Sequence, residues 1–417
     1  MIPAVSSGPY PVREGNLVRP LIGGTAAFQR IGEAVDAARH SVWLTVAFYD
    51  EALRFPEGRG ALFDLLDRAA ARGVEVRALF WRSNPESARY GTIFEGTGAD
   101  RAMLRARGSR VRIRWDRAAG VFCHHQKSWM IDAGMPSETA FVGGLNLTAK
   151  SLERHDAYVE VTGPSGIDVA RNFVQRWNGA SERHAPDGNW NCDGTDEMPV
   201  PAAISGPQGP STVQIQRMLP PDDQSILEQY ERAIDAAQRT IYIENQAIPI
   251  PRIAGRLERA LARGVDVVLL VPAIPEPYVY AARKDPGRRA LFDGVAALGR
   301  HPGFRLVSIA ALEGRERVPT YVHCKLMIVD DVWTTIGSCN LHANSLGGHS
   351  EMNASIWDAA FARELRCALF QRHLGVDTAQ LDAVAAMRFY REIADRNGGS
   401  DWQGEAFTLQ PQKYGVA

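Results

Sequence analysis

The chain lacks several features of secreted and membrane-spanning proteins. It has only five cysteines in 417 residues, an odd number at irregular spacing, which argues against a disulfide framework and for reduced thiols. No apolar run reaches the roughly eighteen residues that a membrane-spanning helix needs. The first ten residues have neither a basic cluster nor an apolar stretch of signal-peptide type. These absences indicate a cytoplasmic protein, unless a leader peptide has been removed.

An excess of charge is also lacking. Lys and Arg number 47 against 48 Asp and Glu, and the formal net charge at pH 7 is −1. Without a positive field over the whole molecule, general binding to nucleic acid is disfavoured. Seven arginines do crowd the stretch from Arg101 to Arg117 and could line an approach for an anionic substrate. A solvated surface is the more ordinary interpretation of such a cluster.

What the sequence does contain is one pattern that occurs twice. Each copy has His-x-Lys followed, after four further residues, by Asp, and then a glycine-rich turn that carries an asparagine. The two motifs are His125, Lys127 and Asp132 in the first copy and His323, Lys325 and Asp330 in the second. The two turns are Gly143-Gly144-Leu145-Asn146 and Gly337-Ser338-Cys339-Asn340. One match could arise by chance, but two in one chain indicate an internal duplication.

The duplication extends to neighbouring segments and predicts two domains. The stretch Ala71–Val76 has a counterpart in Ala262–Val267, with the same Ala-Arg-Gly-Val beginning. Between residues 178 and 212 the periodicity vanishes while Gly, Pro, Asn and Asp accumulate, which is typical of a linker. We therefore predict an N-terminal unit over residues 1–205, including this linker, and a C-terminal unit over residues 206–417.

Strands and helices are predicted to alternate within each unit. Ser41–Phe48 is β-branched, aromatic and apolar on both faces, which predicts a buried strand. An amphipathic helix over Gly60–Arg72 and a strand over Val74–Trp81 follow, and the first motif lies on an expected strand, Val121–Ile131. The pattern predicts an α/β fold of two tandem α-β-α sandwich units, each a mixed sheet covered by helices, related by pseudo-two-fold symmetry. Glu276–Arg289, rich in Tyr and Arg, is predicted to be a loop, either near the active site or on an ordinary charged surface.

The duplicated residues suit phosphate chemistry. Residues two apart on a strand project to the same side, so each histidine should lie beside its lysine. A fixed positive charge can neutralise the non-bridging oxygens while an imidazole attacks phosphorus, and Asn146 and Asn340 would donate to the same oxygens. Two facing histidines could share the reaction, one forming a phosphohistidine and the other protonating the leaving oxygen. No metal or other cofactor is expected, because lysine beside histidine would repel a cation.

Carboxylates near the motifs are predicted to have two roles. Asp156 and Glu351 occupy equivalent places ahead of each unit's closing strand, and are the candidates for orienting the imidazoles. Asp132 and Asp330 lie beyond the expected motif strand and are predicted to tie down the turn that carries the asparagine. The turn residues with a structural role would be Gly143, Gly144, Gly337 and Ser338.

At these residues the chain resembles the phospholipase D superfamily, which is marked by a duplicated His-x-Lys-x-x-x-x-Asp and a Gly-Ser-x-Asn-like turn. The resemblance covers nearly the whole chain, and the segment Ile241-Tyr242-Ile243-Glu244-Asn245-Gln246 looks most like phospholipase D proper. It implies a phospholipase D-like fold and a metal-independent phosphodiesterase, with His125 as nucleophile and His323 as general acid and base. One departure is that the first copy has four extra residues between Asp132 and Gly143, and Gly144 where the second has Ser338.

The resemblance favours an enzyme that hydrolyses phospholipid head-group esters or passes the phosphatidyl group to an alcohol. Its substrate would lie at a membrane surface, and one monomeric chain would hold both motifs. A nuclease, or a phosphodiesterase for a small soluble diester, would use the same chemistry, although the near-zero net charge counts against nucleic acid. A non-catalytic phosphate- or lipid-binding scaffold is a third hypothesis, and the intact residues of both motifs count against it.

Overall fold

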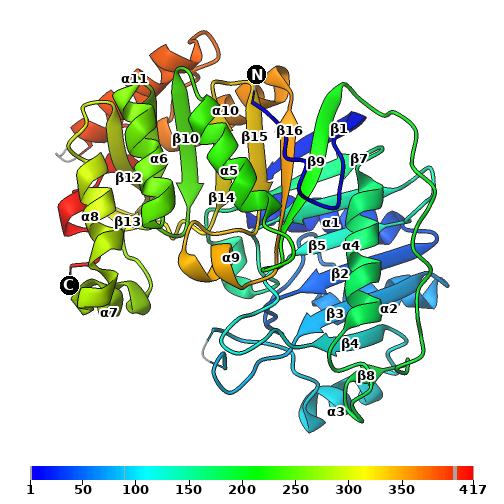
Figure 1. Ribbon diagram of the computed structural model, residues 1–417. Coiled ribbons are helices and arrows are strands. Elements are labelled where there is room, and N and C mark those ends of the chain that lie inside the picture. Colours follow the sequence, from blue (N-terminus) through cyan, green and yellow to red (C-terminus); the bar gives the residue numbers. More distant parts are fainter. Residues whose placement is uncertain (1, 89, 398–401, 417) are drawn as a thin grey trace.

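Two sheets with the same strand order form the framework of the molecule (Figure 1), which a computed structural model describes over residues 2–88, 90–397 and 402–416. The first sheet contains β1 (Arg13–Ile22), β2 (Ser41–Val46), β3 (Glu75–Trp81), β4 (Arg112–Asp116), β5 (Ser128–Ile131), β6 (Thr139–Gly143), β7 (Ala157–Thr162) and β8 (Asn189–Trp190). Its order is β1-β7-β6-β5-β2-β3-β4-β8, with β2, β3 and β4 parallel and the other pairs antiparallel.

The second sheet repeats this arrangement strand for strand. It contains β9 (Ser211–Met218), β10 (Thr240–Asn245), β11 (Asp266–Leu270), β12 (Phe304–Glu313), β14 (Lys325–Val329), β15 (Trp333–Gly337), β16 (Glu351–Trp357) and β17 (Ala406–Thr408). Its order is β9-β16-β15-β14-β10-β11-β12-β17, again with three parallel strands, and β13 (Glu316–Pro319) forms a hairpin with β12. The two sheets join where β1 pairs with β9. The predicted duplication and the mixed α/β architecture are therefore confirmed.

Helices cover the sheets on both faces. The first unit has α1 (Gly24–Ala37), α2 (Leu62–Ala71), α3 (Gly98–Ala106), α4 (Gly166–Gly179) and the short η1 (Ala149–Leu152). The second has α5 (Ser225–Ala236), α6 (Pro251–Ala262), α7 (Pro277–Lys284), η2 (Pro286–Arg288), α8 (Arg289–Leu298), α9 (Ala343–Gly347), α10 (Ala359–Leu374), α11 (Ala383–Arg396) and η3 (Pro411–Lys413). None of the helices described is long and apolar enough to cross a bilayer.

Local sequence signals explain where the longest helix begins and ends. Asp358 caps the N-terminus of α10, since its carboxylate accepts from the backbone N–H groups of Ala360 and Phe361. Gly375 ends the helix with φ of 67°, a left-handed conformation that glycine adopts without steric cost. Between these caps, Leu365 and Leu369 lie on the buried face one turn apart.

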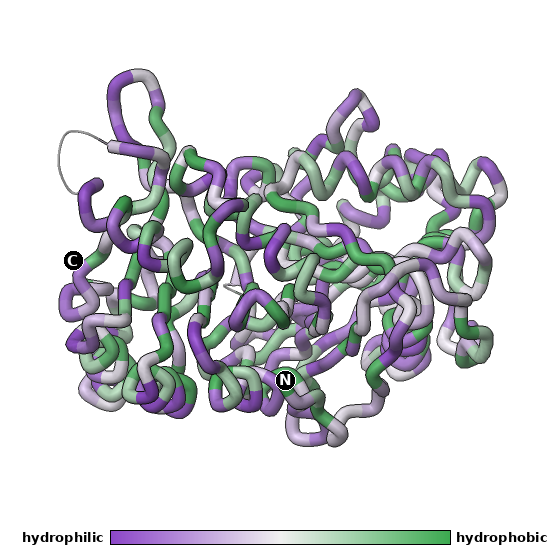
Figure 2. The backbone as a smooth tube through the Cα atoms, turned by 90° about the horizontal axis from the view of Figure 1, so that it is seen from above, coloured by the Kyte–Doolittle hydropathy of each residue, from purple (hydrophilic) through white to green (hydrophobic). Residues whose placement is uncertain are grey.

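One apolar cluster is shared by the two units and holds them together. Val142 and Val159 of the first sheet belong to the same buried cluster as Ile215, Ile336 and Ala354 of the second. In Figure 2, hydrophobic segments (green) and hydrophilic segments (purple) alternate along the chain, and the purple ones are frequent on the outer loops. Each fully buried aliphatic side chain contributes about 1.5–3 kcal/mol relative to exposure. This shared core fixes the orientation of one sheet against the other.

The N-terminal segment differs from its predicted unit in one respect, because residues 2–10 pack against the second half of the chain. Gln214 of β9 donates to the backbone carbonyls of Val5 and Tyr10, both at 2.9 Å. Trp357 donates to the carbonyl of Ile2 at 2.7 Å. These residues precede β1 in sequence, yet they complete the core of the C-terminal unit.

Candidate active site

The two motif segments cross the interface between the units. The His125 backbone N–H donates to the Ser350 carbonyl at 2.8 Å, and the His323 N–H donates to the His155 carbonyl at the same distance. The predicted motif strand, Val121–Ile131, is therefore too long. Strand β5 begins only at Ser128, because the residues before it bond to the opposite unit instead of to their own sheet.

Each histidine is held by a carboxylate from the other half of the chain. His125 Nδ1 lies 2.9 Å from Glu351 Oε2, and His323 Nδ1 lies 2.5 Å from Asp156 Oδ2. All four side chains are buried. When Nδ1–H donates a hydrogen bond to the carboxylate, Nε2 carries the lone pair and can act as nucleophile or base. Sequence reasoning identified both carboxylates, but it gave no indication that the pairs are crossed.

The residue in each asparagine turn that faces the carboxylate is suited to the length of that carboxylate's side chain. Ser338 and Ser345 donate to the two oxygens of Glu351, both at 2.6 Å. In the first unit the equivalent of Ser338 is Gly144, and a Cβ added there would lie 2.4 Å from Asp156 Oδ1. The shorter Asp156 thus occupies the space that a serine side chain would need. The departure noted in the sequence, glycine in one turn and serine in the other, follows from this difference.

The histidines and lysines of the two units lie near one another. Burial lowers the pKa of His125, and the nearby Lys127 and Lys325 lower it further. Burial also lowers the pKa of His323, with Lys325, Lys127 and His125 among the nearby charges that add to it. The pKa of each imidazole is therefore lowered by the lysines of both halves. Low pKa values keep the free imidazoles neutral, as a nucleophile requires, and a bound phosphodiester anion would raise them again.

The two lysines are fixed by their own motif. Lys127 Nζ donates to the carbonyl of His125 at 2.6 Å, and Lys325 Nζ donates both to the carbonyl of His323 and, at 3.0 Å, to Gln246 Oε1. Burial lowers the pKa of Lys127 to about 7 and that of Lys325 to about 8. Both ammonium groups are thus poorly solvated in the free site, which favours the binding of an anion.

Asn146 and Asn340 lie in the turns as predicted, and their carboxamides are free. Both are buried, yet neither Oδ1 atom has a hydrogen-bond partner among the described residues. Buried amide groups are normally satisfied, so these oxygens are available to accept from a donor on a ligand, whereas a phosphate oxygen would need the Nδ2–H groups. Each turn packs closely against the neighbouring strand, because Gly143 and Gly337 lack side chains. A Cβ at Gly337 would lie 2.3 Å from the Met352 carbonyl oxygen.

The motif aspartates bind a different turn from the one predicted. Asp132 accepts from the backbone N–H groups of Arg39, His40 and Ser41, which connect α1 to β2. Asp330 does the same for Gln238, Arg239 and Thr240 between α5 and β10, each at 2.8 Å. Each aspartate ends the motif strand beside the start of its neighbour, so the nearest unpaired N–H groups belong to that neighbour and not to the asparagine turn.

A buried network behind Asp156 was missed by sequence reasoning. His155 Nε2 lies 2.6 Å from Glu244 Oε2, and Tyr242 donates to Glu244 Oε1 at 2.8 Å. Burial alone would raise the pKa of Glu244, but the nearby His155 and His373 lower it to about 2. His155, Glu244 and His373 are the set of metal-ligating residues that the described part of the chain brings within 4.8 Å. The hydrogen bond from His155 of the first unit to Glu244 of the second joins the units.

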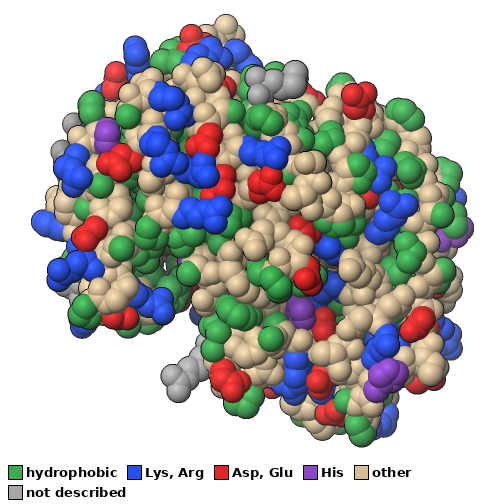
Figure 3. All heavy atoms as spheres, in the orientation of Figure 1, with side chains coloured by type: hydrophobic (Ala, Val, Ile, Leu, Met, Phe, Trp, Pro, Cys, Tyr) green, Lys and Arg blue, Asp and Glu red, His purple; other side chains and the backbone are tan. Residues whose placement is uncertain are grey.

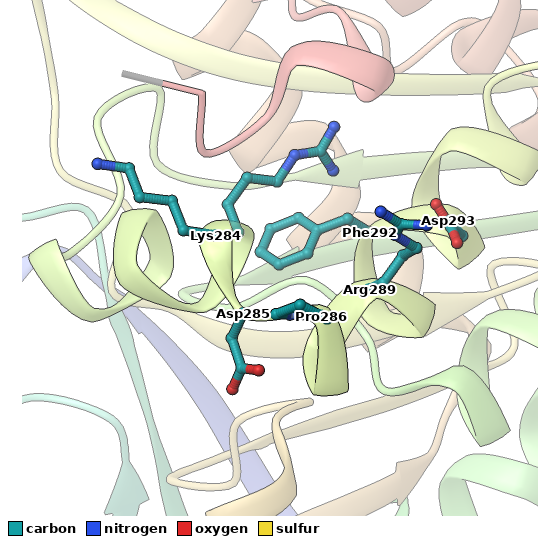
Figure 4. A pocket seen from close by; sticks show the side chains of 7 residues that line it. Lys284, Asp285, Pro286, Arg289, Phe292 and Asp293 are labelled. Atoms are coloured by element: carbon teal, nitrogen blue, oxygen red, sulfur yellow. The ribbon is translucent and has the colours of Figure 1, made fainter.

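The segment Glu276–Arg289 is helical, which corrects the predicted loop. It forms α7 and η2, and Pro277 at the first position of α7 suits a helix start. Only its beginning reaches the site, where Tyr321 donates to Glu276 at 2.7 Å. Figure 4 shows the other end, a hollow of about 250 Å³ lined by charged side chains of α7 and α8. Neither motif histidine lines this hollow.

The surroundings of the two histidines differ in chemistry. Figure 3 shows two lobes with a notch in the outline where they meet at lower left. On the His125 side the surroundings are aromatic: Phe48 and His349 lie 5.9 and 5.8 Å from the His125 ring, and Tyr90 and Phe122 pack on His349. The His323 side is polar instead.

Comparisons with known proteins agree with this architecture. The family model described as "Cardiolipin synthase, PLD-like domain" matches residues 31–177 and 230–373. Cardiolipin synthase A of Pseudomonas putida (strain GB-1) is 28% identical over 368 residues, covering 85% of this chain and 68% of that protein. Cardiolipin synthase 1 of Staphylococcus epidermidis is 26% identical over 367 residues, covering 85% and 67%. These relatives carry the name of another branch than phospholipase D proper.

A solved structure has the same fold. Phosphatidylserine synthase of Haemophilus influenzae Rd KW20 superposes with a TM-score of 0.60 at 14% identity, covering 91% of this chain and 93% of that one. The family match spans both motif segments and most of both sheets. The chain therefore belongs to the phospholipase D superfamily, in the family of cardiolipin synthase-type domains.

Proposed function

We propose that the protein transfers or hydrolyses phospholipid head-group esters through a phosphohistidine intermediate. The observation that carries this proposal is the pair of crossed contacts, His125 with Glu351 and His323 with Asp156. The proposal is supported by the buried lysines as well, since Lys127 and Lys325 are both close enough to lower the pKa of each histidine. The relatives named cardiolipin synthase support a phospholipid as the substrate.

The reaction would proceed in two displacements. His125 Nε2 attacks phosphorus as the bond to the head-group oxygen breaks, and His323 gives its proton to that oxygen. Water or an alcohol then attacks phosphorus from the same side, with His323 taking its proton, and His125 leaves. Lys127, Lys325 and the two asparagine amides would neutralise the non-bridging oxygens throughout. The order of the histidines follows the family resemblance.

A burst experiment would assign the two histidines. With a p-nitrophenyl phosphodiester, whose leaving group needs no proton, His323→Ala should release about one equivalent of p-nitrophenol and then stall as a covalent adduct on His125. His125→Ala should give no burst, and both variants should lose turnover by about a hundredfold to ten-thousandfold. Peptide mass spectrometry of the stalled protein would locate the adduct. A burst from His125→Ala with an adduct on His323 would reverse the assignment.

The substrate class needs a separate measurement. Rates on phospholipid vesicles would be compared with rates on single-stranded DNA and on a small soluble diester at matched phosphodiester concentration. We expect the lipid to be preferred. A preference for the soluble diester would support the second hypothesis of the sequence analysis, and phosphate binding without cleavage of any activated diester would support a scaffold.

A further inference from the structure

We infer that Arg154, Glu276 and Tyr321 form a head-group subsite beside His323, and that this subsite favours head groups that carry both an ammonium and a carboxylate. The inference deepens the proposed function and rests on it. Together with Gln246, these side chains form a polar group in which every member is half-buried, whereas His323 and Lys325 beneath them are 3% and 1% exposed.

Tyr321 is fixed at the centre of the group. Its hydroxyl donates to Glu276 Oε1 at 2.7 Å and accepts from Gln246 Nε2 at 2.9 Å. Gln246 in turn accepts from Lys325 at 3.0 Å, so a continuous chain of hydrogen bonds runs from Glu276 to the candidate catalytic lysine. The Tyr321 ring lies 6.4 Å from the His323 ring, at an interplanar angle of 32°. The subsite is therefore held in register with the reacting groups.

Two opposite charges at this ring lack ionic partners. The Arg154 guanidinium lies 4.7 Å above the Tyr321 ring and makes no hydrogen bond or ion pair within the described residues. The Glu276 carboxylate accepts from the Tyr321 hydroxyl and has no cationic partner in the same part of the chain. Arg154 is close enough to lower the pKa of both His323 and Lys325. A ligand could satisfy both charges at once.

The proposed chemistry puts the head group at this place. In an in-line displacement the leaving oxygen departs opposite the nucleophile. With His125 attacking, the phosphorus–oxygen bond to the head group breaks toward His323, which protonates the released alcohol. The head group thus lies on the polar side of the site and away from the aromatic side around His125. An incoming alcohol would occupy the same subsite in the second displacement.

The charges select the class of head group. A carboxylate fits the planar guanidinium of Arg154, which can donate two parallel hydrogen bonds. An ammonium would pair with Glu276. A head group of the serine type carries both charges on neighbouring carbons, ethanolamine and choline carry only the positive one, and glycerol carries neither. Serine-type head groups should therefore gain most from this pair.

The test compares four phospholipids with the same acyl chains and with serine, ethanolamine, choline or glycerol head groups, presented in mixed vesicles of equal surface charge. The readout is the kcat/KM of each. For the unchanged protein, the serine lipid should have the highest value. Arg154→Gln should lower the serine-to-glycerol ratio by about tenfold or more, the usual effect of losing a charged hydrogen-bonding partner. Glu276→Gln should lower both the serine-to-glycerol and the ethanolamine-to-glycerol ratios.

Matched variants away from the site control for charge. Arg388→Gln and Glu364→Gln each remove one exposed charge from the helices α11 and α10, and should leave every ratio unchanged. Equal losses on all four lipids in the Arg154 and Glu276 variants, or a wild-type preference for glycerol that neither variant alters, would overturn the subsite while leaving the proposed function intact. If the wild-type protein cleaves no diester of any kind, both proposals fail together.

Discussion

At the scale of single residues, the important feature is the crossing of the histidine–carboxylate pairs. The duplicated motif predicts two histidines, two lysines and two carboxylates as site residues, because each type recurs at an equivalent place. The partner of each imidazole could not be predicted, since it depends on how the two units pack. Glu351 and Asp156 reach across that interface.

Removing either carboxylate's charge should slow the reaction. In Glu351→Gln the amide can no longer fix the His125 tautomer or stabilise positive charge on the ring, and we expect kcat to fall by about a hundredfold or more. Asp156→Asn should act likewise through His323. Steady-state kinetics on vesicles would measure this, with Glu160→Gln, a buried carboxylate paired with Arg30, as the control. A kcat within threefold of wild type in both variants would contradict the orienting role.

The lysines should impose an alkaline limit on substrate capture. Their pKa values of about 7 and 8 mean that both ammonium groups are charged below this range and lose their charge as pH rises through it. Because kcat/KM reports the free enzyme, it should begin to fall above about pH 7, where Lys127 loses its charge, and fall further above about pH 8, where Lys325 does. Lys127→Arg keeps its charge at all these pH values. Its residual activity should therefore show an alkaline limb shifted upward, and an unshifted limb would exclude Lys127 as the titrating group.

At the scale of strands and turns, the sequence predicted which segments are strands better than where they begin. Ser41–Phe48 was recognised by its β-branched and aromatic residues, and β2 covers most of it. The motif strand was predicted several residues too long, because residues before Ser128 have a strand-like sequence but find their partners in the other unit. Such pairing depends on contacts distant in sequence, which local pattern cannot reveal.

The motif aspartates should govern stability in both units alike. Asp132→Asn and Asp330→Asn would each weaken a set of three backbone hydrogen bonds to a charged oxygen, and we expect each to lower the free energy of unfolding by about 2 kcal/mol. Asparagine tolerates the positive φ of 51° and 55° at these positions, so backbone strain should not contribute. Denaturant titration would measure the change. A loss of activity without a loss of stability would point to a role in the reaction instead.

Making the two asparagine turns alike should be harmful. Gly144→Ser gives the first turn the sequence of the second, but its Cβ would displace the Asp156 carboxylate, 2.4 Å away. We expect kcat to fall more in this variant than in Ser338→Ala. The Ser338→Ala change removes one hydrogen bond to Glu351 but does not push the Glu351 carboxylate out of its place. Parallel kinetic measurement of the two variants tests this order, and an unimpaired Gly144→Ser enzyme would show that the turn can yield.

At the scale of the whole molecule, apolar residues are exposed at the edge of the second sheet where the parallel strands β11 and β12 end. Several of these apolar residues lie at or just after the C-terminal ends of the parallel strands, where polar loops are usual. Ile274 and Tyr278, after β11, are 61% and 50% exposed, and Leu312 at the end of β12 is 59% exposed. Basic residues accompany them, including Lys284 in α7 and Arg315 in the β12–β13 hairpin. This combination suits contact with an anionic bilayer.

Substitution on this edge should separate lipid contact from chemistry. Ile274→Asp combined with Leu312→Asp should weaken co-sedimentation with anionic vesicles and slow cleavage of vesicle lipid, because charge replaces apolar contact with the acyl boundary. Cleavage of a soluble short-chain diester should be unaffected. Val200→Asp, at a 69% exposed position in the linker, serves as control. Equal losses on the soluble and the vesicle substrate would show damage to the site itself.

The two halves are not free to be identical, and the asymmetry has a consequence for how such a chain can specialise. A pair of separate, identical subunits would have to give both imidazoles the same acidic partner in the same surroundings. Here the His323 imidazole is hydrogen-bonded to an aspartate that packs against a glycine. The His125 imidazole is hydrogen-bonded to a glutamate that accepts from two serine hydroxyls. Fusing the copies into one polypeptide let mutation adjust the two proton affinities independently, so that one imidazole could become the better attacker and the other the better proton donor.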